Sequence, residues 1–304
     1  MATEVPEYEI RLMKREEIPD VLDLWRETGL SEGTHSVETW FEYDPEGFYV
    51  AVTDDGLVIG VCAGILQHHD LAFIGMYAVK STFQRRGIGR KIWNKVMERV
   101  GDRNAGVNPV PEMLENYRDR AGFPIQSDWL SVVCVAKEVL TSEMISEIPG
   151  VDVNVISSED DETTHSAAEY DSQVFGFSRG RLIPILCREE DSITVIATKS
   201  HDNSVCGYGN IKKNIKGNAL VGPLFADDSC IAELVLYHLI KSFPEAESKG
   251  VTLMAIDCNQ DALDMVEKLG FRKEPGTARL YRSEEVDVQF NKVFAQHNLN
   301  FSVF

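Results

Sequence analysis

The chain has 304 residues, of which 43% are hydrophobic and 26% are charged, an ordinary composition that excludes a disordered chain as the expectation. Its 30 basic and 49 acidic residues leave a formal net charge of −19, which disfavours nucleic acid because proteins that bind it present a basic face. The first residues lack the basic and apolar regions of a secretory signal, and no apolar run could span a membrane. We therefore expect a cytoplasmic protein that binds neither nucleic acid nor a membrane.

The six cysteines are scattered along the sequence, with no C-x-x-C pair and no cluster with histidine at metal-ligand spacing. We expect reduced thiols in the core and predict no metal site. The length suits two domains of about 150 residues each.

The first half is expected to alternate antiparallel strands with helices. Apolar periodicity predicts strands at residues 8–13, 48–53, 58–67, 71–79, 105–109 and 129–139. It predicts helices at residues 18–28, 37–43, 90–100 and 112–120. Hairpins combined with crossover helices imply an α/β fold of the α+β kind, with a mixed sheet covered by helices on both faces.

The second half repeats this order of elements. Residues 141–150, which include the turn-forming pair Pro149-Gly150, are predicted to link a domain of residues 1–140 to one of residues 151–304. Strands are expected at residues 151–157, 193–199, 205–211, 217–224 and 251–257. Helices are expected at residues 165–175, 230–243 and 260–269. The sequence thus predicts two tandem domains, each a mostly antiparallel sheet flanked by helices.

A glycine motif, Gln84-Arg85-Arg86-Gly87-Ile88-Gly89, separates the strand that ends at Val79 from the next helix. Backbone N–H groups at the start of a helix lack intrahelical partners and therefore suit an anionic phosphate. Glycines without a Cβ let the backbone approach a pyrophosphate closely. The alternative is an ordinary helix N-terminus with glycines in its turn. The four basic residues around the motif favour a phosphate site: Arg85, Arg86, Arg90 and Lys91.

Val79 and the glycine motif together resemble the V-x4-[RQ]-x-x-G-x-[GA] acyl-CoA signature of the GNAT superfamily of N-acetyltransferases. Further blocks are similar to those of the YitH-like tandem GNAT proteins, at residues 44–48, 73–77, 101–104, 116–117, 122–123, 207–209, 221–228 and 277–282. The resemblance covers nearly the whole chain. It implies two GNAT-like domains in tandem, with acetyl-CoA as the co-substrate.

The resemblance also implies which residues hold acetyl-CoA. Backbone groups at the end of the strand would pair with the pantetheine arm like an added strand and donate hydrogen bonds to the thioester oxyanion. The glycine motif would hold the pyrophosphate. The expected cofactor-binding residues are Tyr77, Ala78, Val79, Gln84, Arg85, Arg86, Gly87, Ile88, Gly89, Arg90 and Asn116.

Direct attack of an amine on the thioester, as the resemblance implies, needs a base for the amine and an acid for the departing thiolate. Tyr117 is the candidate general acid. It lies five residues before Gly122, whereas the family's tyrosine usually lies four before its glycine, and a buried structural tyrosine is the alternative. Glu32 and His35 are the candidate bases.

His68 and His69 are further candidate bases, since histidine has a suitable ordinary pKa. For these two residues, as for Glu32 and His35, the alternative is a solvated position in a loop.

The second domain differs at the place of its phosphate loop. Asp227 and Asp228 stand there without paired glycines, and carboxylates repel phosphate, so we predict that only the first domain binds acyl-CoA. Val266 occupies the place of the candidate acid and has no proton to donate. Several residues of the second domain could form a ligand pocket, or Asp171 could form an ion pair with an arginine: Asp171, Phe175, Arg179, Thr277, Arg279 and Tyr281.

The leading hypothesis is an acetyl-CoA-dependent N-acetyltransferase that acts on a primary amine of a small molecule, with catalysis in the first domain. A catalytically silent acyl-CoA sensor and a protein lysine acetyltransferase are the alternatives. The sequence leaves the acceptor, the acyl-chain preference and the oligomeric state open.

Overall fold

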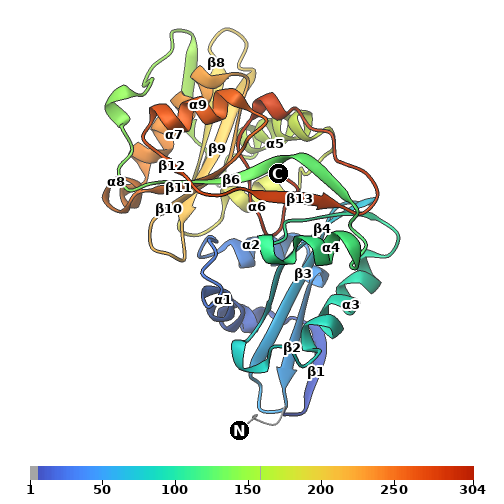
Figure 1. The fold of residues 1–304 in the computed structure, drawn as a ribbon. Helices are drawn as coiled ribbons and strands as arrows, with labels where there is room; N and C mark the ends of the chain where they lie inside the picture. The colour runs from blue at the N-terminus through green and yellow to red at the C-terminus, as the bar shows by residue number, and fades with distance from the viewer. Residues whose placement is uncertain (1–5, 158) are drawn as a thin grey trace.

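The computed structural model describes residues 6–157 and 159–304, and their strands form one continuous fourteen-stranded mixed sheet (Figure 1). The main path runs β1-β2-β3-β4-β5-β13-β6-β11-β10-β9-β8-β7, with β12 paired to β6 and β14 paired to β10. The strands are β1 (Tyr8–Leu12), β2 (Phe48–Thr53), β3 (Val58–His68), β4 (Leu71–Val79), β5 (Asn104–Val107), β6 (Ile125–Ala136), β7 (Val151–Val155), β8 (Ser192–Lys199), β9 (Val205–Lys213), β10 (Ala219–Ala226), β11 (Val251–Ile256), β12 (Arg272–Lys273), β13 (Thr277–Tyr281) and β14 (Val293–Ala295).

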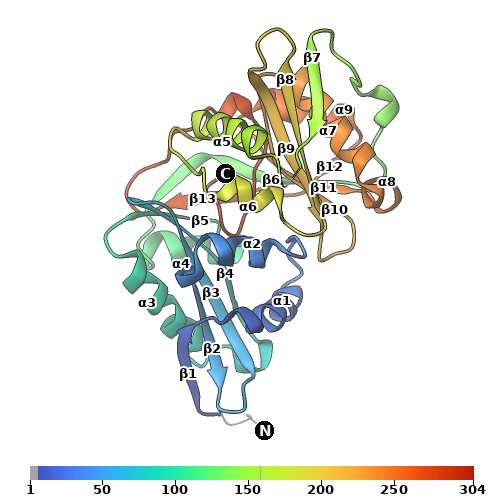
Figure 2. The same cartoon turned by 180° about the vertical axis from the view of Figure 1, so that it is seen from behind.

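The helices cover both faces of this sheet, as the figures show for each half. The helices are α1 (Ile18–Arg26), α2 (Ser36–Tyr43), α3 (Ile88–Val100), α4 (Leu114–Asp119), α5 (Asp161–Phe175), α6 (Leu182–Cys187), α7 (Ser229–Ser242), α8 (Pro244–Lys249) and α9 (Gln260–Lys268). In the first half α1 and α3 lie on opposite faces, and in the second half α5 and α7 do (Figure 2). Within the described residues, no helix is both long enough and apolar enough to cross a membrane.

The two halves are internal repeats. Strands β1 to β4 form an antiparallel meander and β5 then adds parallel to β4; strands β7 to β10 and β11 follow the same order and the same directions. The prediction of a mixed α/β fold with two tandem domains is confirmed.

The halves exchange their last strands, which the sequence did not predict. Strand β13 from the second half pairs with β5, while β6 from the first half pairs with β11. Strands β13 and β6 also pair with each other, so the two sheets become one. The linker at residues 141–150 and the boundary at residue 140 stay predictions. Strands from the two sides of that boundary pair with each other.

Most predicted elements are present, with shifted ends. Strands β2 and β4 have the predicted bounds, whereas α1 ends at Arg26 and the helix expected at residues 90–100 begins at Ile88. The helix expected from residue 165 begins at Asp161, because the Asp160 side chain accepts a hydrogen bond from the Thr163 N–H and caps it. The strand expected at residues 129–139 instead spans β6. Helices α6 and α8 were not predicted, since six residues show too little periodicity.

The segment after β14, residues 296–304, returns from the second half to the first. Phe301 packs against Trp40 and Phe48, with ring centroids 5.7 and 5.6 Å apart, inside the core between α1, α2 and the first-half sheet. Phe304 is also fully buried, among aromatic residues of both halves. We call residues 293–304 the C-terminal segment.

Candidate active site

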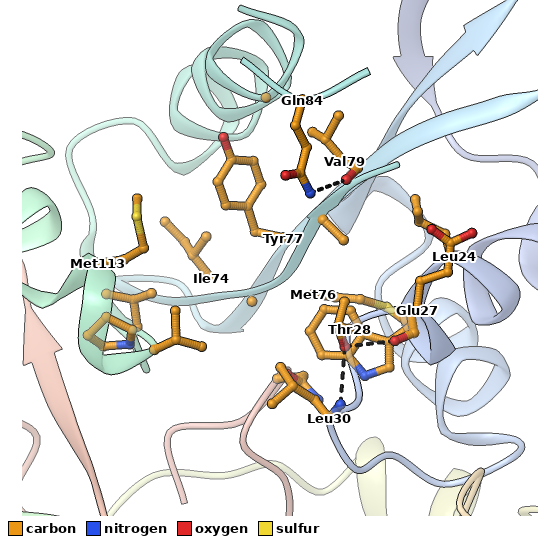
Figure 3. Close-up of a pocket in the computed structure, with 18 of the residues that line it drawn as sticks. Leu24, Glu27, Thr28, Leu30, Ile74, Met76, Tyr77, Val79, Gln84 and Met113 are labelled. Atoms are coloured by element: carbon orange, nitrogen blue, oxygen red, sulfur yellow. Dashed lines mark hydrogen bonds between the residues drawn. The ribbon is translucent and has the colours of Figure 1, made fainter. Parts of the chain in front are cut away.

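A cavity of about 990 Å³ opens where β4 and β5 separate (Figure 3). The two strands pair in parallel from Leu71 and Asn104 up to Ile74 and Val107, and no further. Beyond Ile74 the edge of β4 that faced β5 borders the cavity, and Gly75 to Val79 line it. An extended ligand can therefore pair with this free edge in the manner of an added strand.

The glycine motif forms the far end of the cavity as a left-handed turn. Arg85 and Gly87 have φ angles of 61° and 81°, and Gly87 is the N-cap residue of α3. Residues with positive φ therefore alternate with residues with negative φ along the loop. This alternation turns successive backbone N–H groups toward one point and makes a concave binding site, or nest, for an anion. No side chain of the described residues caps α3, so its first N–H groups and its positive dipole end are available to a phosphate.

Close packing explains the second glycine. A Cβ on Gly89 would collide with the Tyr77 hydroxyl. The Gln84 Nε2 donates a hydrogen bond of 2.9 Å to the Val79 carbonyl, which ties the loop to the end of β4 (Figure 3). Any side chain at Gly89 would therefore force the Tyr77 side chain or the loop to move.

The cavity collects most of the cofactor-binding residues that the sequence predicts. Nine of them line it: Tyr77, Ala78, Val79, Gln84, Arg85, Gly87, Ile88, Gly89 and Arg90. Arg86 and Asn116 are not among the lining residues. The Asn116 carbonyl accepts hydrogen bonds from the N–H groups of Arg120 and Ala121, at the end of α4.

Tyr117 reaches the same cavity from α4. Its side chain is 7% exposed, its ring packs edge-on against Trp93 at 5.3 Å, and no described residue bonds its hydroxyl. Burial raises the pKa of Tyr117 above its ordinary value of 10, so the hydroxyl keeps its proton at neutral pH. A protonated hydroxyl at the cavity wall can donate a proton to a leaving group.

Tyr77 also packs against Trp93, with ring centroids 5.9 Å apart. Burial raises its pKa to about 12, so it too is protonated at neutral pH. The sequence predicted only its backbone as part of the site, yet its ring also lines the cavity (Figure 3).

Glu32 and His35 do not line this cavity. Glu32 is fully buried, and its carboxylate accepts hydrogen bonds from the Gly33 N–H and from the side-chain amides of Asn298 and Asn300, at 2.8 to 3.0 Å. Glu32 therefore fastens the C-terminal segment to the first half. His35 lies beside Glu190 and Asp191 in a separate surface hollow.

The pH dependence of stability tests the burial of Glu32. Burial raises its pKa above 4.5, and the hydrogen bonds from Asn300 and Asn298 oppose this only in part. The folded state then binds the proton more tightly than the unfolded state, so this contribution is full below pH 4.5 and is lost as pH rises through the folded pKa.

We expect the Glu32→Gln variant to lose this dependence. Urea unfolding from pH 5 to 8 should show wild-type stability falling relative to the variant as the pH rises. The exposed Glu143→Gln control should run parallel to wild type. A wild-type stability that rises with pH relative to Glu32→Gln would show that the carboxylate is favoured in the folded state.

His68 is the last residue of β3 and His69 lies in the turn to β4, and neither lines the cavity. With Asp70 they form a surface group whose ligand atoms lie within 4.8 Å of one another, which is the one group of described residues that could hold a metal ion. The His69 Nε2 lies 2.6 Å from an Asp70 carboxylate oxygen, and both side chains are exposed.

In the second half, Asp227 and Asp228 occupy the place of the phosphate loop. The Asp228 carboxylate caps α7 by accepting a hydrogen bond of 2.9 Å from the Ile231 N–H. Asp227 accepts from the Lys292 ammonium at 3.0 Å. A carboxylate thus holds the helix end that a phosphate would need. Val266 is fully buried in the core.

The buried polar residues of the second half form structural contacts rather than an open pocket. Asp171 and Arg179 make an ion pair of 2.6 Å with both side chains at 0% exposure, and the Tyr208 hydroxyl donates to the same carboxylate at 2.5 Å. Arg179 also donates to the Ser302 hydroxyl at 2.8 Å, so the pair holds the C-terminal segment. Of the two interpretations left open by the sequence, the geometry favours the ion pair.

Arg279 is buried between the halves. Its Nε donates to the Asn108 side chain at 2.6 Å, and its guanidinium donates to the Val303 carbonyl. Burial lowers the pKa of this guanidinium, and the faces of Phe73, Trp129 and Phe304 surround it.

Sequence reasoning missed the opposite wall of the cavity. It consists of the end of α1 with the turn after it, where Figure 3 labels Leu24, Glu27, Thr28 and Leu30, and of two residues of the C-terminal segment. The residues of this wall are Leu24, Trp25, Glu27, Thr28, Leu30, Leu299 and Asn300. Glu27 is the one carboxylate among the described lining residues. The amphipathic pattern of α1 gave no sign of it, since Glu27 simply follows the last helical turn.

Comparison with known proteins agrees with this geometry. Residues 18–118 match the Acetyltransferase (GNAT) family, and residues 167–295 match the Acetyltransferase (GNAT) domain. The residues matched to the family include β4, β5, the glycine motif and α3, which border this cavity. The chain belongs to the GNAT superfamily of acyltransferases, and it is a tandem member of the YitH-like kind.

Two curated relatives span most of the chain. Holothin acyltransferase of Pseudoalteromonas sp. (strain SANK 73390) is 23% identical over 264 residues, 86% of this chain and 84% of that protein. The uncharacterized N-acetyltransferase YitH of Bacillus subtilis (strain 168) is 23% identical over 237 residues, 77% of this chain and 78% of that one.

Solved structures share the fold. A candidate acetyltransferase from Pyrococcus horikoshii has a TM-score of 0.73 at 18% identity, covering 97% of this chain and 96% of its own. A tandem GNAT protein from the clavulanic acid biosynthesis pathway has a TM-score of 0.62 at 17% identity, covering 90% of this chain and 98% of its own.

Proposed function

We propose that the protein is an acetyl-CoA-dependent N-acetyltransferase that acetylates a primary amine of a small molecule in the cavity of its first half. The observation that carries the proposal is the cavity itself: an open β4 edge leads from an uncapped, glycine-lined helix N-terminus to a buried tyrosine. The anionic end of the cofactor matches the helix end, and the pantetheine arm matches the open edge.

The chemistry then has three parts. The β4 edge positions the thioester and supplies backbone N–H donors where the oxyanion develops. The amine nitrogen attacks the acyl carbon and loses its proton, the C–S bond breaks, and the thiolate takes a proton from Tyr117. No cysteine lines the cavity in the described part of the chain, which supports direct attack over an acyl-cysteine intermediate.

The charge on the acceptor side of the cavity supports the proposal that the substrate is a cation. Glu27 stands there among apolar side chains, and a carboxylate attracts an ammonium group and can accept its proton. The net charge of −19 adds an attractive field for amines. Six free cysteines support a reducing compartment, so we place the protein in the cytoplasm.

We expect the Glu27→Gln variant to lower kcat/KM for a primary amine about tenfold, equal to about 1.4 kcal/mol of transition-state stabilisation. The effect is modest because the Glu27 side chain is 44% exposed and is already paired with Lys80 at 3.2 Å. Steady-state rates at fixed acetyl-CoA measure it. The matched control is Glu98→Gln, which also loses a lysine partner, on the outer part of α3. Equal rates in both variants would show that Glu27 is not part of the acceptor site.

Incubation with acetyl-CoA and a metabolite extract tests the proposal, with mass spectrometry to detect acetylated products. We expect a small primary amine to gain one acetyl group, with release of one equivalent of CoA. If acetyl-CoA binds but no acceptor is modified, the silent sensor is the better description. If only peptides are modified, the protein is a lysine acetyltransferase.

A further inference from the structure

The C-terminal segment crosses both places where parallel strands separate, and it does so at the same register. In the second half β10 and β11 pair from Ala219 and Val251 to Val221 and Leu253. The next residue of β10 is Gly222, as Gly75 follows Ile74 in β4. These two glycines occupy equivalent positions.

The C-terminal segment lies against each of these glycines, in the space that a side chain there would occupy. A Cβ on Gly222 would collide with the carbonyls of Gln296 and His297, and a Cβ on Gly75 would collide with the Asn300 carbonyl. The strand on the other side of each gap also contacts the segment, through a hydrogen bond. The Gln296 N–H donates to the Met254 carbonyl of β11 at 2.8 Å, and the Asn108 side chain, just after β5, donates to the Leu299 carbonyl at 3.0 Å.

The two gaps differ beyond this crossing point. In the second half the segment continues along the gap as β14, pairing Ala295 with Leu224 and Val293 with Phe225. The chain itself thus fills the edge of β10 that corresponds to the open edge of β4. In the first half the segment leaves the gap open and closes only its base, where Leu299 and Asn300 line the cavity.

Buried polar contacts hold this base rigidly. Glu32 binds the amides of Asn298 and Asn300, Arg179 binds Ser302, and Arg279 binds Val303. Both halves therefore fix the segment on either side of Leu299. A wall held in this way has a constant position and can limit the length of a bound group that reaches it.

We propose that Leu299 limits the length of the acyl group that the first-half cavity accepts. The inference rests on the proposed function, in which the cofactor enters at the glycine motif and runs along β4 toward Gly75. Its acyl end then points at the base of the gap, where Leu299 is the apolar side chain supplied by the C-terminal segment. Shortening this side chain makes room for additional methylene groups.

The test compares acetyl-CoA with butyryl-CoA, as Kd by calorimetry and as kcat/KM with one fixed amine. We expect Leu299→Ala to shift the butyryl-to-acetyl ratio about tenfold in favour of butyryl, since two methylene groups gain an apolar site. Leu299→Phe should shift the ratio in the opposite direction. Leu57→Ala, an exposed leucine in the β2–β3 turn, is the matched control.

The outcomes separate the two claims. If wild type binds acetyl-CoA and transfers the acetyl group, but neither Leu299 variant changes the ratio relative to Leu57→Ala, only the role of Leu299 is overturned. If wild type binds neither acyl-CoA, the proposed function fails and the role of Leu299 fails with it. The two opposite substitutions keep the test decisive if one variant folds poorly.

Discussion

The Gly87→Asp variant is expected to raise the Kd for acetyl-CoA about a hundredfold or more while the protein stays folded. Gly87 is the N-cap of α3, and the space where its Cβ would point is open, so an aspartate fits without a clash. Its carboxylate would occupy the place of the phosphate. Like charges about 4 Å apart repel by up to about 4 kcal/mol at a protein surface, and about 2.7 kcal/mol suffices for a hundredfold loss.

The second half already contains this arrangement, because the Asp228 carboxylate caps α7 at the corresponding place. The variant therefore converts the first loop into a version of the second. Calorimetric titration with acetyl-CoA measures the effect.

Gly150 offers a closely matched control. It has the same φ of 81° and equally open surroundings, but it lies beside β7, away from the cavity. Both variants force an aspartate into the left-handed region, at a cost of about 1–2 kcal/mol of stability. Gly150→Asp should therefore lose similar stability and keep full affinity for acetyl-CoA. Unchanged affinity in Gly87→Asp would mean that the pyrophosphate binds elsewhere.

The Tyr117→Phe variant is expected to lower kcat about a hundredfold or more with little change in the Kd for acetyl-CoA. Loss of a general acid typically reduces a rate by about 10² to 10⁴. The ring stays packed against Trp93 and Phe123, so removal of the hydroxyl alone should leave the wall of the cavity in place. Single-turnover rates at saturating acetyl-CoA measure the chemical step.

Tyr77→Phe and Tyr43→Phe complete this experiment. Tyr77 also lines the cavity with a protonated hydroxyl, whereas the Tyr43 hydroxyl donates to the Gln67 carbonyl outside it. We expect Tyr43→Phe to match wild type. A large loss in Tyr77→Phe with none in Tyr117→Phe would assign the proton donor to Tyr77.

The pH profile follows from the same residue. Because burial holds the pKa of Tyr117 above 10, its hydroxyl stays protonated, and activity should not decline between pH 7 and about 9. The rate should instead rise over this range, as an acceptor ammonium with a pKa of about 10.4 loses its proton.

The wall of the cavity that β4 and the glycine motif form was predictable because its signals are local. The apolar run of β4, the glycines after it and the helix that begins at Ile88 are adjacent in sequence, and each follows from backbone chemistry. The helix expected from residue 230 was equally predictable, and in the structure it begins at Ser229 with Asp228 as its cap. Tyr117 was found through the family resemblance, and the structure brings it to the same cavity.

The opposite wall of the cavity was not predictable, because distant segments supply it. Leu299 and Asn300 reach the cavity through packing of the C-terminal segment, nearly 200 residues after Asn108, which binds the Leu299 carbonyl. Glu32 resembles a solvated loop residue in the sequence, yet it is buried because two asparagines from that segment satisfy its carboxylate. The exchange of β6 and β13 has the same origin, since a strand's neighbour is set by tertiary packing.

A crystal structure of the protein with saturating acetyl-CoA tests the central claim most directly, because that claim assigns the cofactor to one of two related gaps. We predict one acetyl-CoA per chain, with its pyrophosphate at the N-terminus of α3, its arm along β4 and its acetyl group between Met76, Tyr117 and Leu299. In the second half β14 should remain paired with β10. A cofactor at the N-terminus of α7, or one that displaces β14, would contradict this assignment.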